Sequence, residues 1–216
     1  MTTIFRNLLC ELQLVYFIYS KLLNMKIGID IDDVLLDFLD PLNNYYNQKY
    51  RTSHKFGDYK VYNLGHTWKR DQDFTIAEIF SFYESEDFLN LNPRKDSQES
   101  IDKLFNKGFE LFAITSRPTS IQNITEQSIS KHFGNKFKDI ILTNSFGRNG
   151  VRIEKYKVCN NLGIDIMIDD CIEYAEECAN NNVEKVYLMP MPFNFEFSNR
   201  KIIRAEWQDI LKDLNI

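Results

Sequence analysis

Three aspartates, Asp30, Asp32 and Asp33, directly follow a short apolar run at residues 25–29. A β-branched run that ends in acids is typical of a buried strand whose carboxyl end opens into a site. Ligands bind at that end in open α/β sheets. Asp30 and Asp32 can converge there on one point, where their mutual repulsion would require a cation. The alternative is a helix N-terminus, because acids stabilise the positive end of a helix dipole.

Two further strand-like runs end in residues suited to the same site. Residues 164–168 are apolar and lead into Asp169 and Asp170, and residues 110–114 lead into Thr115. Because the carboxyl ends of parallel strands share one edge of a sheet, runs that end in this way predict one shared site. Hydroxyl and carboxylate oxygens can hold an oxyanion and a metal there. Carboxylates are hard ligands, which favours magnesium over zinc.

The order of these residues resembles that of the haloacid dehalogenase (HAD) superfamily. Residues 30–34 resemble its D-x-D-x-[T/V] motif and Thr115 its second motif. Lys155 resembles the third motif, and the pair Asp169 and Asp170 resembles the acidic fourth. The resemblance covers the chain from residue 26 onward. More narrowly, the chain resembles the 5'-deoxyribonucleotidase branch and its bacterial nucleotidase-like relatives, on residues 30–37, 115–118, 142–144, 155–159 and 168–170.

The resemblance implies a magnesium-dependent phosphomonoesterase that works through an aspartyl-phosphate. Asp30 would be the nucleophile. Asp32 would protonate the leaving alkoxide and later deprotonate the attacking water. Asp30, Asp169 and Asp170 would bind Mg²⁺, with the family's pattern favouring Asp170 over Asp169 as a direct ligand. The backbone carbonyl of Asp32 would add a further ligand. The cation offsets the repulsion between a phosphate dianion and the incoming nucleophile.

Thr115, Ser116 and Lys155 are predicted to bind the phosphate. Thr115 would donate its hydroxyl to a phosphate oxygen, or would instead cap the next helix; Ser116 can share either role. Lys155 would balance the phosphate charge. Lys157 is its rival, and a solvated lysine at a helix start is the alternative for both. Arg117 is expected to pair either with phosphate or with a surface acid.

Two other acids near the first motif are expected to have supporting roles. Asp33 stands where the superfamily commonly has glycine, and it is expected either to support the site or to face solvent. Asp37 is expected to serve the helix that follows it rather than the chemistry.

The composition is that of an ordinary globular protein. The chain has 216 residues, of which 44% are hydrophobic and 26% are charged, which allows one full core and a modest insertion. Its net charge of −5 and its lack of a basic run argue against a polynucleotide substrate. The four cysteines lack zinc-type spacing, which predicts buried free thiols in a reducing cytoplasm.

The first 24 residues are apolar but interrupted by charged and polar side chains. They are too short and too polar to predict a membrane span, and no small-residue cleavage site marks a secretory signal. An upstream start codon or a loosely packed extra helix is the expected explanation. No membrane partner is expected.

The pattern of the chain predicts an α/β fold with an insertion. Strand-like and helix-like runs alternate after residue 97, which indicates a parallel sheet with helices on both faces. The resemblance implies that this sheet is HAD-like and of the Rossmann type. Residues 38–96 break the alternation and are expected to form a small, mostly helical insertion, which the resemblance implies is a cap domain. The core domain would then comprise residues 25–37 and 97–216, with residues 1–24 as an N-terminal extension. Helices are predicted at residues 75–83, 97–106, 121–132, 156–162 and 171–180, and strands at residues 25–29, 110–114, 139–142, 164–168 and 185–188.

Aromatic residues in the predicted cap are the one indication of the leaving group. They can form a base-stacking wall or fill the core of the cap: Tyr45, Tyr46, Phe56, Tyr59, Tyr62, Trp68, Phe80, Phe82 and Tyr83. The resemblance implies a nucleobase under the cap, so the leading hypothesis is a nucleotidase for nucleoside 5'-monophosphates, deoxyribonucleotides above all. The alternatives are a phosphatase for another monoester, such as a polynucleotide end or a sugar phosphate, and a non-catalytic nucleotide-binding protein. A homodimer is left open.

Overall fold

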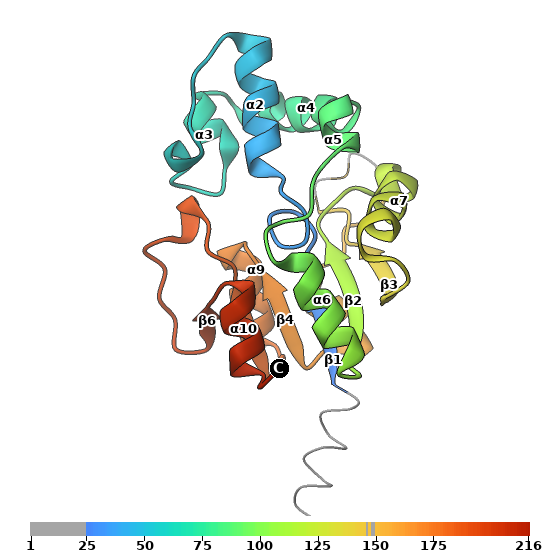
Figure 1. Cartoon of the computed structure of the whole chain (residues 1–216). Coiled ribbons are helices and arrows are strands. Elements are labelled where there is room, and N and C mark those ends of the chain that lie inside the picture. The colour runs from blue at the N-terminus through green and yellow to red at the C-terminus, as the bar shows by residue number, and fades with distance from the viewer. Residues whose placement is uncertain (1–24, 146, 148–149) are drawn as a thin grey trace, which may run out of the picture.

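The computed structural model describes residues 25–145, 147 and 150–216. These residues build a six-stranded, wholly parallel sheet in the order β3-β2-β1-β4-β5-β6 (Figure 1). The strands are β1 (Lys26–Ile29), β2 (Glu110–Thr115), β3 (Phe137–Leu142), β4 (Ile166–Asp169), β5 (Lys185–Leu188) and β6 (Ile202–Arg204). The predictions made for residues 1–24 lie outside the described residues.

Strand β1 lies near the middle of the sheet and pairs with β2 on one side and β4 on the other. All three strands run in the same direction, so the loops that follow them emerge at one edge. These are the loops that carry the acids, the hydroxyls and Arg117. The sheet topology therefore brings together side chains that are spread over about 140 residues of sequence.

Helices cover both faces of the sheet, because side chains alternate along each strand. Ile29 and Ile168 belong to the larger apolar cluster, together with residues of α6, α7 and α10. Met167 belongs to the second cluster, which α8 and α9 complete. A Cβ on Gly28 would lie 2.9 Å from side-chain atoms of Ile114 and Met167, so glycine lets this second face pack closely.

The core helices alternate with the strands, and all but α10 were predicted from the sequence. They are α6 (Ser97–Asn106), α7 (Gln122–Phe133), α8 (Lys155–Leu162), α9 (Ile172–Asn180) and α10 (Trp207–Asp213), with short 3₁₀ turns η2 (Thr119–Ile121) and η3 (Pro192–Asn194). Gly163 ends α8 in the left-handed conformation, at φ +67°, which glycine adopts without steric cost.

The insertion after β1 is helical, and in Figure 1 it lies beyond the carboxyl ends of the strands. Its elements are α2 (Leu39–Tyr50), η1 (Phe56–Asp58), α3 (Leu64–Trp68), α4 (Gln72–Tyr83) and α5 (Glu86–Leu89). We call residues 38–96 the cap; its status as a separate domain stays a prediction. The parallel α/β sheet and the helical insertion are confirmed.

Several elements were not predicted individually, including the short cap helices α3 and α5 and the longer elements α2 and α10 and strand β6. Helix α2 is rich in asparagine and tyrosine and contains a proline in its first turn, so its periodicity is weak. Strand β6 is three residues long, with two of them exposed. Helix α10 packs against α6 and follows a stretch without clear periodicity. Within the described residues, no helix combines the length and the apolar character needed to cross a bilayer.

Candidate active site

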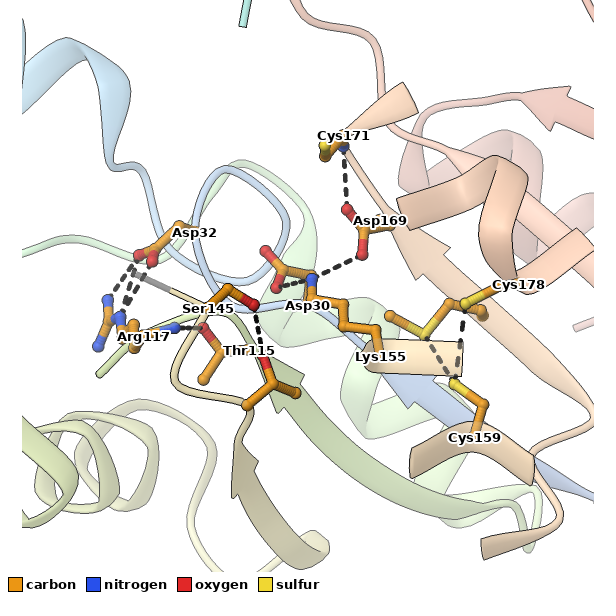
Figure 2. A network of polar contacts seen from close by, with 12 residues as sticks. Asp30, Asp32, Thr115, Arg117, Ser145, Lys155, Cys159, Asp169, Cys171 and Cys178 are labelled. Carbon is orange, nitrogen blue, oxygen red and sulfur yellow. Dashed lines mark hydrogen bonds and ion pairs between the residues drawn. The ribbon is translucent and has the colours of Figure 1, made fainter. Parts of the chain in front are cut away.

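Lys155, the first residue of α8, lies between two carboxylates from two different strand ends. Its Nζ donates to Oδ1 of Asp30 at 2.5 Å and to Oδ2 of Asp169 at 2.7 Å, as Figure 2 shows. All three side chains are buried. Burial alone would lower the pKa of Lys155, but Asp169 and Asp30 raise this pKa well above its ordinary value. The lysine is therefore a fixed positive charge in contact with the candidate nucleophile.

Three carboxylates meet around this lysine. Oxygens of Asp30, Asp169 and Asp170 lie within 4.8 Å of one another. Burial raises the pKa of Asp30 to about 7, although Lys155 lowers it and Asp169 raises it further. Burial also raises the pKa of Asp170 well above its ordinary value, and repulsion from Asp169 adds to this shift. One ammonium does not neutralise three buried carboxylates, so the cluster fits a bound cation, and its oxygen donors fit Mg²⁺.

The two acids after β4 have different surroundings. Oδ2 of Asp169 accepts from Lys155, and its Oδ1 accepts from the backbone N–H of Cys171 at 2.9 Å. The carboxylate of Asp170 has no hydrogen-bond partner among the described residues and lines the cavity. This arrangement leaves Asp170 the freer of the two to bind an ion, in line with the preference drawn from the sequence.

Asp32 points away from this cluster, toward Arg117. The guanidinium donates through Nη2 to Oδ1 at 2.6 Å and through Nε to Oδ2 at 3.0 Å. Arg117 is 1% exposed, and its guanidinium lies 4.8 Å from the centre of the Phe88 ring in the cap. This buried arginine therefore pairs with the candidate general acid rather than with a surface acid, and its contact with a phosphate stays a prediction. The predicted metal contact of the Asp32 carbonyl stays a prediction.

Asp33 is buried and holds the start of the cap. Its carboxylate accepts from the backbone N–H of Phe38 at 2.9 Å and of Leu39 at 3.1 Å, two donors that have no partner inside α2. Its backbone has φ +58°, a conformation that aspartate tolerates better than most residues. Asp33 thus does not face solvent. Asp33, rather than Asp37, accepts from these two N–H groups, and the role expected for Asp37 stays a prediction.

The predicted phosphate-binding residues lie at the same edge. Ser116 lines the cavity. Thr115 is fully buried, and its Oγ1 accepts from the backbone N–H of Arg117 at 3.2 Å, which is a local turn rather than a helix cap. Lys157 is exposed and pairs with Glu154 at 2.8 Å, so of the two lysines the structure brings Lys155 to the site.

A cavity of about 220 Å³ lies between the acids and the cap. Its core side is charged, with Asp30, Asp32, Asp33, Asp170 and Lys155. Its cap side is mostly apolar, and the residues from the cap and from η3 are Phe38, Leu39, Tyr62, Asn63, Leu64, Gln72, Thr75, Ile76, Ile79, Tyr83 and Phe193.

Most cap aromatics fill the interior of the cap. The rings of Tyr46 and Trp68 stack at 4.0 Å, and Trp68 Nε1 donates to the hydroxyl of Tyr59 at 2.9 Å. Of the nine predicted aromatics, Tyr62 and Tyr83 line the cavity. Burial raises the pKa of both hydroxyls above the ordinary value, so both are neutral hydrogen-bonding groups near neutral pH.

Comparison with models of known protein families shows which family the chain belongs to. The model of the family described as "5' nucleotidase, deoxy (Pyrimidine), cytosolic type C protein" matches residues 24–215. The chain belongs to this family. It is therefore a hydrolase of the HAD superfamily, and the HAD and nucleotidase resemblance read from the sequence is confirmed. A search of curated proteins gave no match.

Solved structures agree with the fold of this nucleotidase family member. A predicted phosphatase from Clostridium acetobutylicum has a TM-score of 0.63 at 16% identity, covering 89% of this chain and 99% of that chain. A haloacid dehalogenase-like hydrolase from Streptococcus pneumoniae has a TM-score of 0.62 at 13% identity, with the same coverage. YfnB from Bacillus subtilis, a HAD-hydrolase by name, was solved bound to magnesium; it has a TM-score of 0.56 at 14% identity and the same coverage. At these identities the likeness shows the fold.

The nucleotidase site also contains a pairing and a residue that the sequence did not predict. Arg117 pairs with Asp32 across 85 positions of sequence, and Phe193 comes from the loop after β5 and meets Tyr62 of the cap at 5.3 Å between ring centres. Phe193 stands in no motif, and only the folded loops bring it to the cavity and Asp32 to Arg117. The one available signal for Arg117 was its place directly after Thr115 and Ser116.

Proposed function

We propose that this protein is a magnesium-dependent 5'-nucleotidase that hydrolyses nucleoside monophosphates, deoxyribonucleotides above all, through an aspartyl-phosphate on Asp30. The family membership supports a nucleotide as substrate. The description of the family as cytosolic supports a cytoplasmic location. The observation that carries the proposal is the division of the cavity into a charged floor and an apolar cap wall.

The charged floor fits the phosphate. Lys155 holds Asp30 at 2.5 Å, and a neighbouring ammonium favours the ionised, nucleophilic form of this carboxylate. Thr115 and Ser116, at the end of β2, are proposed to donate to the phosphate oxygens. Asp30 and Asp170 would hold Mg²⁺, which would supply positive charge against the phosphate dianion.

The proposed reaction has two steps on residues of this chain. A carboxylate oxygen of Asp30 forms a bond to phosphorus while the bond from phosphorus to the nucleoside oxygen breaks, and Asp32 gives its proton to that oxygen. Asp32 then takes a proton from a water molecule, whose oxygen displaces Asp30 and releases inorganic phosphate. Arg117 is proposed to orient Asp32 for both proton transfers and to release the Asp32 oxygen that carries the proton.

The cap wall supports a neutral leaving group. Lys155 is the one cation among the described residues that line the cavity, and it already pairs with Asp30 and Asp169. A second carboxylate or phosphate on the substrate would therefore enter without a positive partner, at a substantial cost. A nucleoside is uncharged and presents a flat apolar face to side chains such as Tyr62 and Ile76, as stacking requires.

A phosphate-release screen tests the proposal. Nucleoside 5'-monophosphates, nucleoside 3'-monophosphates, sugar phosphates and 2-phosphoglycolate are compared with Mg²⁺ present and after chelation. We expect kcat/KM for deoxynucleoside 5'-monophosphates to exceed that for 2-phosphoglycolate at least about 100-fold, and chelation to abolish release. Preference for a sugar phosphate would overturn the substrate assignment. Nucleotide binding without any phosphate release would indicate a non-catalytic binding protein instead.

A further inference from the structure

Asn194, the last residue of η3, is a fully buried amide with every hydrogen-bonding position used. Its Nδ2 donates to the carbonyl oxygens of Asp170 at 2.9 Å and Met189 at 2.8 Å. Its Oδ1 accepts from the N–H of Met191 at 2.9 Å and from Nε of Arg204 at 3.2 Å. A side-chain amide has two donors and one carbonyl acceptor, so this network fixes the orientation of Asn194.

This amide contacts the backbone of the acid whose carboxylate is free. The carboxylate of Asp170 has no hydrogen-bond partner among the described residues, unlike that of Asp169, which is held by Lys155 and by the N–H of Cys171. The position of the Asp170 carboxylate therefore depends on its backbone. Asn194 is the side chain that anchors the backbone of Asp170, and it joins this backbone to the loop after β5.

We propose that Asn194 is a positioning residue for the metal site: it holds the turn after β4 so that the Asp170 carboxylate meets that of Asp30. The proposal rests on the Mg²⁺ site proposed above. Side chains that orient metal ligands typically account for 10- to 100-fold in metal affinity when they are replaced. Asn194 has this relationship to Asp170 although it lies outside every motif of the sequence.

Calorimetric titration of the purified protein with Mg²⁺ alone tests the proposal without substrate. We expect Asn194→Ala to weaken Mg²⁺ binding about 10- to 100-fold relative to the unmodified protein. Asn43→Ala is the matched control, because Asn43 is also a buried, hydrogen-bonded amide but bonds within the cap, to His54 and Tyr59. This control should keep the affinity of the unmodified protein. Equal affinity in Asn194→Ala and the unmodified protein would overturn the proposal.

Arg204→Ala gives a second test that does not disturb a buried residue. Arg204 is exposed and donates to Oδ1 of Asn194. If it steadies Asn194, its removal weakens Mg²⁺ binding by a few-fold, whereas loss of a positive charge acting at a distance would strengthen it. If Asn194→Ala does not fold, the Arg204→Ala variant tests the proposal instead. Unchanged or tighter Mg²⁺ binding in Arg204→Ala would overturn it. Absence of Mg²⁺ binding in the unmodified protein would instead refute the metal site itself.

Discussion

The guanidinium of Arg117 binds the carboxylate of Asp32 side-on, with Nη2 2.6 Å from Oδ1 and Nε 3.0 Å from Oδ2. The same guanidinium donates to Oγ1 of Thr125 at 3.2 Å and lies over the ring of Phe88. Arg117 is thus fixed from the core and the cap at once. Its two-point contact holds Asp32 apart from the cluster formed by Asp30 and the acids after β4.

Arg117→Lys should slow the hydrolysis of nucleotides by about 10- to 100-fold, because a lysine cannot form the two-point contact and Asp32 loses its orientation. An aryl phosphate with a good leaving group needs less protonation, so its kcat should fall less. Steady-state kinetics on both substrates checks this. Arg94→Lys is the control, since Arg94 bonds to Pro190 rather than to Asp32. Equal losses on both substrates would contradict the orienting role.

Lys155→Met should destabilise the fold by about 3–5 kcal/mol, because it leaves buried carboxylates without their cation. Denaturant unfolding measures this loss, and Mg²⁺ should restore part of it by neutralising Asp30 and its neighbours. Lys157→Met removes an exposed lysine from the same helix and should change little. Similar unfolding curves for the two variants would show that Lys155 does not hold the cluster together.

Mg²⁺ binding should weaken as the pH falls, because protons compete with the cation for Asp30 and Asp170. Burial raises the pKa of Asp30 to about 7 and that of Asp170 well above its ordinary value. A carboxyl with a raised pKa stabilises the fold at low pH, and this contribution is lost as the pH rises through the raised pKa. Mg²⁺ should therefore raise the Tm more at pH about 8 than at pH about 6. Calorimetry should also detect protons released when Mg²⁺ binds. Equal Tm shifts at both pH values, without proton release, would contradict the competition between protons and Mg²⁺.

The fold was largely predictable because its strands are short apolar runs with clear ends. Helix α6 begins and ends as predicted, since its apolar residues keep a helical spacing. Strand β6 was not predicted because two of its three residues are exposed. Its pairing with β5 stabilises it, although its own sequence has no clear strand pattern. Helix α2 begins where the carboxylate of Asp33 accepts from the N–H groups of Phe38 and Leu39, and this spacing is longer than that of the usual capping motifs.

The candidate site was predictable where each residue stands at the end of a strand or the start of a helix. Asp30, Asp169 and Lys155 occupy such positions, and the sheet order brings them together. The partner of Arg117 and the role of Asn194 were not predictable, because the groups that they bond to lie far away in sequence or are backbone groups. Their roles follow from how the loops turn after the strands, which side-chain types alone do not specify.

The most direct test of Asp30 as the nucleophile is the kcat of Asp30→Asn on a deoxynucleoside 5'-monophosphate at saturating Mg²⁺. The change keeps the size of the side chain and removes the nucleophilic oxygen, so we expect at least a 1000-fold loss, on the order of that for other catalytic nucleophiles. Circular dichroism and thermal unfolding should show an intact fold. Activity within about tenfold of the unmodified enzyme, in a preparation in which deamidation has not restored aspartate at position 30, would contradict the assignment of Asp30 as the nucleophile.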